Sequence, residues 1–210
     1  MRYIDLSHPL VHGNASFPGD PGLSVTDHKT IAADRLNLSL ISMGSHQGTH
    51  LDAMTHFVDG GRTIDRMPLD WFHGPARLLR IPKGPREEIG VADFRPFERY
   101  LTPGAKIIYE TGWHREFGKS NYFADFPSLT QDAARHLAAR RIRLLGMDTP
   151  TPGRDWYEVH HLLLQPPAEI VVVESLAHLD LLPDAFIFSG FPLPFAGRDG
   201  SPIRAVAMVE

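Results

Sequence analysis

Alternating and continuous apolar runs along the chain predict mainly β-strands. Residues 36–40 read Leu-Asn-Leu-Ser-Leu, an alternation typical of a strand with one buried face. Residues 170–173, Ile-Val-Val-Val, are all β-branched and predict a strand buried on both faces of a sheet. Shorter apolar runs predict further strands at 76–81, 106–109, 142–147, 185–188 and 203–209. These runs are numerous enough to form one substantial sheet.

Residues 128–141 carry a helical pattern instead. Their apolar side chains recur at helical spacing, and Ser128 and Gln131 have the spacing of a capping box at the start. A strand pattern follows at once, so we expect this helix to cover a sheet. The predicted fold class is α/β, with a mixed β-sheet covered by helices. No segment between the elements is long enough to be a flexible linker, so residues 1–210 are expected to form a single domain.

Composition and charge restrict the classes of partner. The net charge of −4 gives no general attraction to nucleic acid or to a membrane surface, and no run of 18 apolar residues could span a bilayer. The start of the chain lacks the apolar stretch of a signal peptide, so a cytoplasmic location is expected. The absence of cysteine excludes disulfides, thiolate metal sites and cysteine nucleophiles. The 12 histidines are about twice the usual share, and histidine is the commonest metal ligand.

Several histidines concentrate in one segment, Ser-His-Gln-Gly-Thr-His-Leu-Asp-Ala-Met-Thr-His-Phe, which begins at position 45. His46, His50, Asp52 and His56 all occupy even positions, so in an extended chain they share one face. Gly48 lies on the same face and leaves room for an ion beside the backbone. A helix would also align His46 with His50, but the intervening glycine and threonine disfavour it. We therefore expect a strand or a tight loop.

Two neutral imidazoles and one carboxylate from this segment would make a three-ligand set with an open position, which is typical of catalytic rather than structural zinc. Water bound at such an ion can have a pKa near 7 and supply hydroxide at neutral pH. Scattered surface histidines are the alternative. Three histidines and an aspartate within eleven residues make that alternative the weaker one.

A second candidate cluster lies far downstream. Glu174 directly follows the predicted strand at 170–173, and a carboxylate there is costly to bury unless it is paired or bound to a metal. An ordinary solvated glutamate at a strand end is the alternative. His160 and His161 are adjacent and point in different directions, so at most one of them is expected to be a ligand.

The histidine segment resembles the signature His-x-Gly-Thr-His-x-Asp-x-Pro-x-His of the cyclase family of metal-dependent hydrolases. That family includes bacterial kynurenine formamidase and isatin hydrolase. The chain follows the signature from His46 to His56, with Met54 at the usual proline. Other segments resemble the family along nearly the whole chain: 5–10, 17–20, 145–150, 160–164 and 174–176.

The resemblance implies specific metal ligands. His46, His50 and Asp52 would bind a first ion, and His160 and Glu174 would join Asp52 around a second. The implied cofactor is Zn²⁺, one or two ions per chain, with Mn²⁺ as the other candidate. The fold implied by the family is a swivelling β/β/α domain, typically assembled as a homodimer.

The resemblance also implies an enzyme, a metal-dependent hydrolase acting on C–N bonds other than peptide bonds. Metal-bound hydroxide would attack an aryl formamide such as N-formylkynurenine, the arylformamidase reaction of tryptophan catabolism, with His56 as general acid/base rather than ligand. Phe17, Met54 and Trp71 are candidate apolar walls for the aryl ring. Two alternatives stay open: hydrolysis of a cyclic amide or lactone, as in isatin hydrolase, and binding of a metal or small ligand without turnover.

Overall fold

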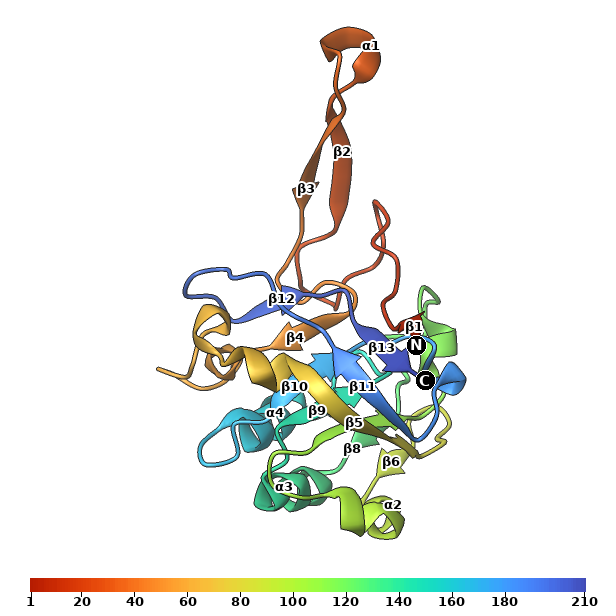
Figure 1. Cartoon of the computed structure of the whole chain (residues 1–210), viewed down its shortest axis with the longest axis vertical. Helices are drawn as coiled ribbons and strands as arrows, with labels where there is room; N and C mark the ends of the chain where they lie inside the picture. The colour runs from red at the N-terminus through yellow and green to blue at the C-terminus, as the bar shows by residue number, and fades with distance from the viewer.

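A nine-stranded mixed sheet forms the centre of the computed structural model, which describes residues 1–210 (Figure 1). The strand order is β1-β13-β11-β5-β7-β9-β10-β4-β12. The strands of this sheet are β1 Arg2–Asp5, β4 His50–Asp52, β5 His73–Arg80, β7 Lys106–Glu110, β9 Leu144–Met147, β10 Val171–Glu174, β11 Ala185–Ser189, β12 Gly200–Pro202 and β13 Val206–Val209. Two smaller pairs are β2 Ser24–Lys29 with β3 Leu38–Ser42, and β6 Glu88–Ile89 with β8 Ser128–Leu129.

The helices are short and lie between the strands in sequence. The α-helices are α1 Ile31–Asp34, α2 Val91–Phe94, α3 Gln131–Arg140 and α4 Trp156–Leu164. The 3₁₀ helices are η1 Met54–His56, η2 Ile64–Arg66, η3 Leu69–Phe72, η4 Arg95–Tyr100, η5 Trp113–Glu116 and η6 Leu179–Leu181. Helices α3 and α4 pack against each other, and α4 also contacts β10. None of the helices combines the length and the apolar character needed to cross a membrane.

The interior of the sheet confirms the predicted α/β class with a mixed sheet. Strands β5, β7, β9 and β10 pair in parallel, whereas β4 pairs antiparallel with β10 and with β12. Residues 170–173 are all buried, as the β-branched run predicted, and Glu174 at the end of β10 is buried as well. One core of 43 buried residues unites the sheet with its helices. This rigid centre holds β4 and β10 side by side, with the carboxyl end of β10 against the amino end of β4.

The helix predicted at 128–141 begins later than its capping pattern indicated. Ser128 lies in β8, which pairs in parallel with β6, so it cannot cap a helix. Thr130 is the N-cap of α3 instead, and its Oγ1 accepts a hydrogen bond from the backbone N–H of Ala133 at 3.1 Å. The prediction of Ser128 as the cap was therefore wrong because the short strand takes that residue first.

Replacing Thr130 by alanine should lower the free energy of unfolding by about 1 kcal/mol, because the first turn of α3 loses its capping oxygen. Urea unfolding followed by circular dichroism measures this difference. Ser128→Ala is the matched control and should have the smaller effect. A larger loss for Ser128→Ala than for Thr130→Ala would contradict the assignment of the cap.

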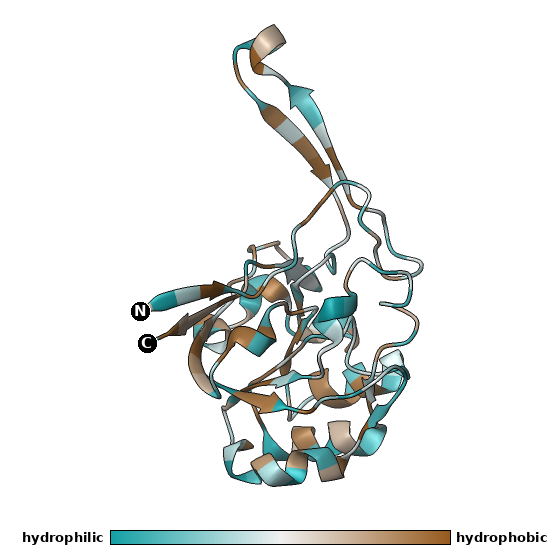
Figure 2. Ribbon diagram, turned by 90° about the vertical axis from the view of Figure 1, so that its right-hand side faces the viewer, coloured by the Kyte–Doolittle hydropathy of each residue, from teal (hydrophilic) through white to brown (hydrophobic).

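The strand predicted at 36–40 exists, but it is not half-buried. Strand β3 pairs with β2 in a hairpin that carries α1 at its tip and projects far from the sheet (Figure 1). Every residue of β3 is exposed, and Figure 2 shows apolar segments along the projecting ribbon. The alternating pattern correctly predicted a strand, whereas the expected buried face is wrong for a single chain.

Candidate metal centre

Strand pairing brings together two parts of the chain that are far apart in sequence. In the antiparallel ladder between β4 and β10, His50 lies opposite Glu174 and Asp52 lies opposite Val172. Helix α4 packs against β10 and carries His160 to the same place. The predicted second cluster therefore meets the histidine segment at the junction of β4, β10 and α4.

The histidine segment is extended only over residues 50–52. His46 lies in a turn that precedes β4, with Gly48 at a φ of +63°, and His56 ends the 3₁₀ helix η1. The uniform strand suggested by the even spacing is thus a turn, a short strand and a helical turn. The four side chains still converge on one place.

Three imidazoles and the carboxylate of Glu174 cluster around Asp52. The Oδ1 atom of Asp52 lies 2.8 Å from Nδ1 of His46 and 3.4 Å from Nε2 of His50. The Nε2 atom of His160 lies 3.4 Å from Asp52 Oδ2 and 3.0 Å from Glu174 Oε1, and Nε2 of His50 lies 3.2 Å from Glu174 Oε2. Two overlapping sets could each hold an ion, His46–His50–Asp52 and Asp52–His160–Glu174.

These atoms suit a divalent cation. Ligands about 2.0–2.2 Å from a tetrahedral zinc ion stand roughly 3.3 Å from one another, close to the separations between these side chains. Asp52 is fully buried, and its Oδ2 has no hydrogen-bond partner. The imidazole of His160 faces this oxygen only at 3.4 Å. A buried carboxylate oxygen that accepts no well-formed hydrogen bond is costly, and a bound cation would remove that cost. The residues present therefore fit a divalent metal ion, and Asp52 is common to the two sets that could hold one.

Backbone carbonyls orient two of the imidazoles. Nδ1 of His50 lies 2.9 Å from the carbonyl oxygen of Gly48, and Nδ1 of His160 lies 2.6 Å from that of Trp156. A carbonyl can only accept, so each Nδ1–H donates and each Nε2 is directed at the carboxylates. Such outer hydrogen bonds fix the tautomer of metal-binding histidines. His161 is turned away, with Nδ1 3.3 Å from the carbonyl oxygen of Phe57, so the structure places His160 in the cluster.

The pKa values of the cluster follow from burial and from the facing charges. Burial lowers the pKa of both His50 and His160, but hydrogen bonds to Asp52 and Glu174 outweigh burial and raise each pKa to about 10. Burial raises the pKa of Asp52, whereas hydrogen bonds from the imidazoles hold it well below its usual range. Without a metal, protons therefore balance the buried carboxylates. A metal ion must displace those protons, so its affinity should rise with pH.

His56 lies beside the cluster rather than within it. Its ring stacks on that of His46, with centroids 3.8 Å apart and planes at 22°. Burial lowers the pKa of His56 to about 4, so the imidazole is neutral at neutral pH. A neutral imidazole at the wall of a cavity can accept a proton from water and return it to a leaving group.

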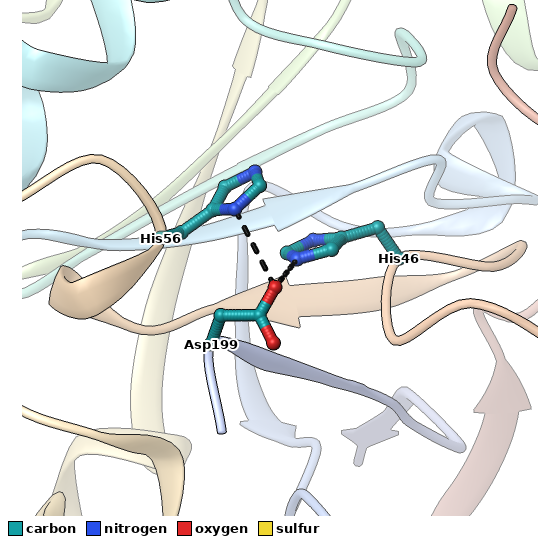
Figure 3. Close-up of side chains that lie close together, drawn as sticks. All are labelled: His46, His56 and Asp199. Atoms are coloured by element: carbon teal, nitrogen blue, oxygen red, sulfur yellow. Dashed lines mark hydrogen bonds and ion pairs between the residues drawn. The ribbon is translucent and has the colours of Figure 1, made fainter. Parts of the chain in front are cut away.

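Asp199 completes the site and was not anticipated from the sequence. Its Oδ2 lies 2.8 Å from Nε2 of His46 and 3.6 Å from Nδ1 of His56 (Figure 3). Burial lowers the pKa of His46, but hydrogen bonds to Asp199 and Asp52 raise it to about 9. Asp199 stands in the stretch Arg-Asp-Gly, which has no metal-binding pattern, so no sequence signal indicated it.

A cavity of about 360 Å³ opens above the cluster. Its aromatic walls are Phe17, Phe57, Phe117, Phe123 and Trp156. The expected wall Phe17 is among them. This lining is large enough to hold one aromatic ring against apolar surface with its polar group directed at the histidines.

The other two expected walls lie elsewhere. Met54 is 1% exposed because the first turn of η1 directs it into the core of the sheet. Trp71 packs against that core, with the guanidinium of Arg143 3.9 Å from its ring centroid. Neither residue lines the cavity, so the expectation that they flank the aryl ring needs correction.

Comparison with known proteins gives full-length relatives. The Cyclase family model matches residues 4–154. The kynurenine formamidase of Bacillus mycoides (strain KBAB4) is 31% identical over 210 residues, covering 98% of this chain and 96% of the relative. The kynurenine formamidase of Bacillus thuringiensis (strain Al Hakam) is 32% identical over 213 residues with the same coverage.

Solved structures share the fold. A structure described as a potential metal-dependent hydrolase with cyclase activity has a TM-score of 0.83 and 25% identity, covering 98% of this chain and 96% of its own. Isatin hydrolase A from Labrenzia aggregata, bound to benzyl benzoate, has a TM-score of 0.85 and 26% identity, with 99% and 93% coverage. Both similarities cover nearly the whole of this chain.

Proposed function

Because the chain belongs to the cyclase family, we propose that it is a metal-dependent hydrolase that cleaves the C–N bond of an aryl formamide such as N-formylkynurenine. One observation carries this proposal. Three imidazoles and the carboxylate of Glu174 cluster around the fully buried Asp52 beside an aromatic cavity, and a neutral histidine, His56, lies next to them. A pure binding site has no need of that additional histidine.

The proposed cofactor is Zn²⁺, one or two ions per chain, with Mn²⁺ as the alternative. His46, His50 and Asp52 would hold one ion, and Asp52, His160 and Glu174 the other. Imidazole and carboxylate ligands suit zinc, and the cluster contains no thiolate. When bound, such an ion polarises a carbonyl and lowers the pKa of water at neutral pH.

The residues of the chain bind the substrate and transfer the proton. The aromatic walls hold the aryl ring and exclude water from around it. His56 accepts the proton that the attacking water loses and delivers it to the leaving nitrogen. A C–O bond forms as the C–N bond breaks, and the products are formate and an arylamine. At neutral pH the imidazole of His56 is unprotonated, so it has a free nitrogen that can accept the proton.

A cyclic amide is the second candidate substrate. The similarity to an isatin hydrolase extends over 99% of this chain, and a flat bicyclic ring would fit between the same aromatic walls. Ring opening needs the same attack and the same proton transfer, but the amine and the new carboxylate remain in one molecule. Binding of a small ligand without turnover is the remaining alternative.

The deciding experiment measures metal content and hydrolysis on one sample purified without added ions. N-formylkynurenine and isatin are assayed side by side, before and after removal of metal with a chelator. Hydrolysis of N-formylkynurenine that is lost on chelation and restored by Zn²⁺ or Mn²⁺ supports the proposal. Hydrolysis of isatin but not of N-formylkynurenine would show that the substrate is a cyclic amide instead of an aryl formamide. Failure to bind either ion would overturn the proposal of a metal-dependent reaction.

We also propose that two copies assemble through the β2–β3 hairpin. The hairpin exposes large apolar side chains far from the core: Ile31, Leu36, Leu38, Leu40 and Ile41. Exposed apolar area on a projecting arm is costly in water and is typical of a surface that another chain covers. A second copy of the chain is the occupant that we propose, because the hairpin projects away from its own sheet and leaves these apolar side chains uncovered (Figure 2).

Leu40→Asp should convert this dimer to a monomer, because the charged side chain would have to be buried in the interface. Light scattering after size-exclusion chromatography measures the mass. Leu181→Asp is the matched control, since Leu40 is 59% exposed and Leu181, outside the hairpin, is 57% exposed. Two results would contradict the proposal: a monomeric parent protein, or equal dissociation in both variants.

A further inference from the structure

Each imidazole that faces Asp52 uses its second nitrogen for an outer hydrogen bond. His50 and His160 donate to backbone carbonyls through Nδ1. His46 is reversed, because its Nδ1 faces Asp52 and its Nε2 lies 2.8 Å from Oδ2 of Asp199. The orientation of His46 therefore depends on a side chain, which a point mutation can remove, rather than on the backbone.

The position of Asp199 is itself held from several directions. Its backbone carbonyl accepts a hydrogen bond from the N–H of Ala53 at 2.8 Å, at the end of β4. The Oγ of Ser45 lies 3.3 and 3.2 Å from its two carboxylate oxygens. These contacts fix the carboxylate beside the turn that carries His46.

The next residue allows the close approach. A Cβ atom at Gly200 would lie 2.6 Å from Cε1 of His46 and 2.8 Å from the carbonyl oxygen of Leu51. Only glycine lets the His46 ring lie directly against the start of β12. The imidazole of His46 therefore packs closely against Gly200 and the carboxylate of Asp199, and this packing restricts rotation of the ring.

The same carboxylate oxygen also faces His56, at 3.6 Å from Nδ1, while the two imidazoles stack (Figure 3). One acceptor therefore lies next to both an expected metal ligand and the expected acid/base. Displacing it would free both rings at once.

We propose that Asp199 is a positioning residue that directs Nδ1 of His46 toward the metal and holds His56 in place beside it. This inference rests on the proposed function. Asp199 acts through these two histidines and does not itself contact the substrate. A carboxylate behind a metal-binding histidine fixes its tautomer and strengthens it as a ligand, and its loss typically weakens metal affinity 10–100-fold.

A competing interpretation makes Asp199 a ligand. His46, His56 and Asp199 lie close enough together to hold an ion themselves. That ion would occupy Nε2 of His46, whose Nδ1 already faces the main cluster. The two roles differ in stoichiometry, because a positioning residue changes affinity and a ligand of a separate ion changes the number of ions bound.

The test compares Asp199→Ala, Asp199→Asn and the neighbouring control Arg198→Ala. Zn²⁺ affinity is measured by competition with a chromophoric chelator at fixed pH. We expect binding to weaken 10–100-fold in Asp199→Ala. We expect it to recover in part in Asp199→Asn, whose amide oxygen still accepts from Nε2–H, and to stay unchanged in Arg198→Ala. With saturating metal, Asp199→Ala should lower kcat more than it changes KM, because His56 is misplaced.

Nitrogen-detected NMR of the histidines in metal-free protein provides a readout that needs neither ion nor substrate. The Nε2–H proton of His46 should exchange slowly in the parent protein and in Asp199→Asn, and rapidly in Asp199→Ala. If the parent protein binds no ion, the proposed function fails, and this signal still tests the positioning role. Unchanged Zn²⁺ affinity together with an unchanged Nε2–H signal in Asp199→Ala would overturn the inference. The inference would also be overturned if Asp199→Ala bound one ion fewer per chain and kept its affinity for the remaining ions.

Discussion

His50→Ala should lose bound metal and hydrolytic activity together. His50 is 3% exposed, and its Nε2 lies 3.4 Å from Asp52 and 3.2 Å from Glu174, so it contacts both carboxylates. Alanine leaves those carboxylates facing each other with one fewer imidazole between them. We expect Zn²⁺ affinity to fall by at least about 100-fold, as for removal of a direct ligand, whose effect exceeds that of an outer contact.

Atomic emission measures the metal content, and the rate of hydrolysis is measured with whichever substrate the parent protein hydrolyses. His161→Ala is the matched control. It removes an imidazole next to His160 in sequence, but that imidazole faces the carbonyl oxygen of Phe57 instead of the cluster. Equal metal loss in the two variants would show that the assignment of ligands is wrong. A His50→Ala protein with full metal content and full activity would also show that His50 is not a ligand.

His56→Ala should keep its metal and lose about 100-fold or more in kcat, the usual scale for removal of a general acid/base. His56 makes no contact with Asp52 or Glu174 within ion-pair distance, so the cluster keeps its three imidazoles. The neutral state of the His56 imidazole also gives the direction of the pH dependence. Because burial lowers its pKa to about 4, protonation of His56 itself should reduce the rate of the metal-saturated enzyme only as the pH falls through that range.

Metal content and the rate with saturating Zn²⁺ are measured on the same preparation. His56→Gln is a useful companion, because glutamine keeps a polar side chain there but cannot carry a proton between two groups. It should be as inactive as the alanine variant. If His56→Ala instead strips the metal, His56 is a ligand and the proton must be carried by another group.

Much of the site was accessible from the sequence because its residues are close neighbours along the chain. His46, His50 and Asp52 lie within seven residues, so even an irregular backbone leaves their side chains together. Glu174 could be inferred for a different reason, since a carboxylate at the end of a wholly apolar strand needs a partner. The comparison of His160 with His161 required the structure, because only the packing of α4 against β10 decides which one faces inward.

Asp199 and the walls of the cavity depend on contacts between distant segments. Asp199 reaches His46 only because β12 pairs with β4, a contact across about 150 positions of sequence. Met54 lies within the motif and Trp71 follows it closely in sequence. The turn of η1 directs Met54 into the core, and Trp71 packs against the guanidinium of Arg143, so neither side chain lines the cavity. The β2–β3 hairpin is a similar case. The alternating pattern at 36–40 predicts a strand, but it does not show which segment or chain covers the apolar face.

The position of β4 between β10 and β12 has a consequence for how the protein is made. The histidine segment leaves the ribosome early, but both neighbours of β4 are synthesised more than a hundred residues later. Until then β4 has no partner on either edge, and Asp52 has neither Glu174 nor the turn that contains Asp199 beside it. Nascent chains carry the signature without His160 and Glu174, so the complete cluster can form only near the end of synthesis. An ion bound there ties the beginning of the chain to its last quarter and should stabilise the finished fold by mass action.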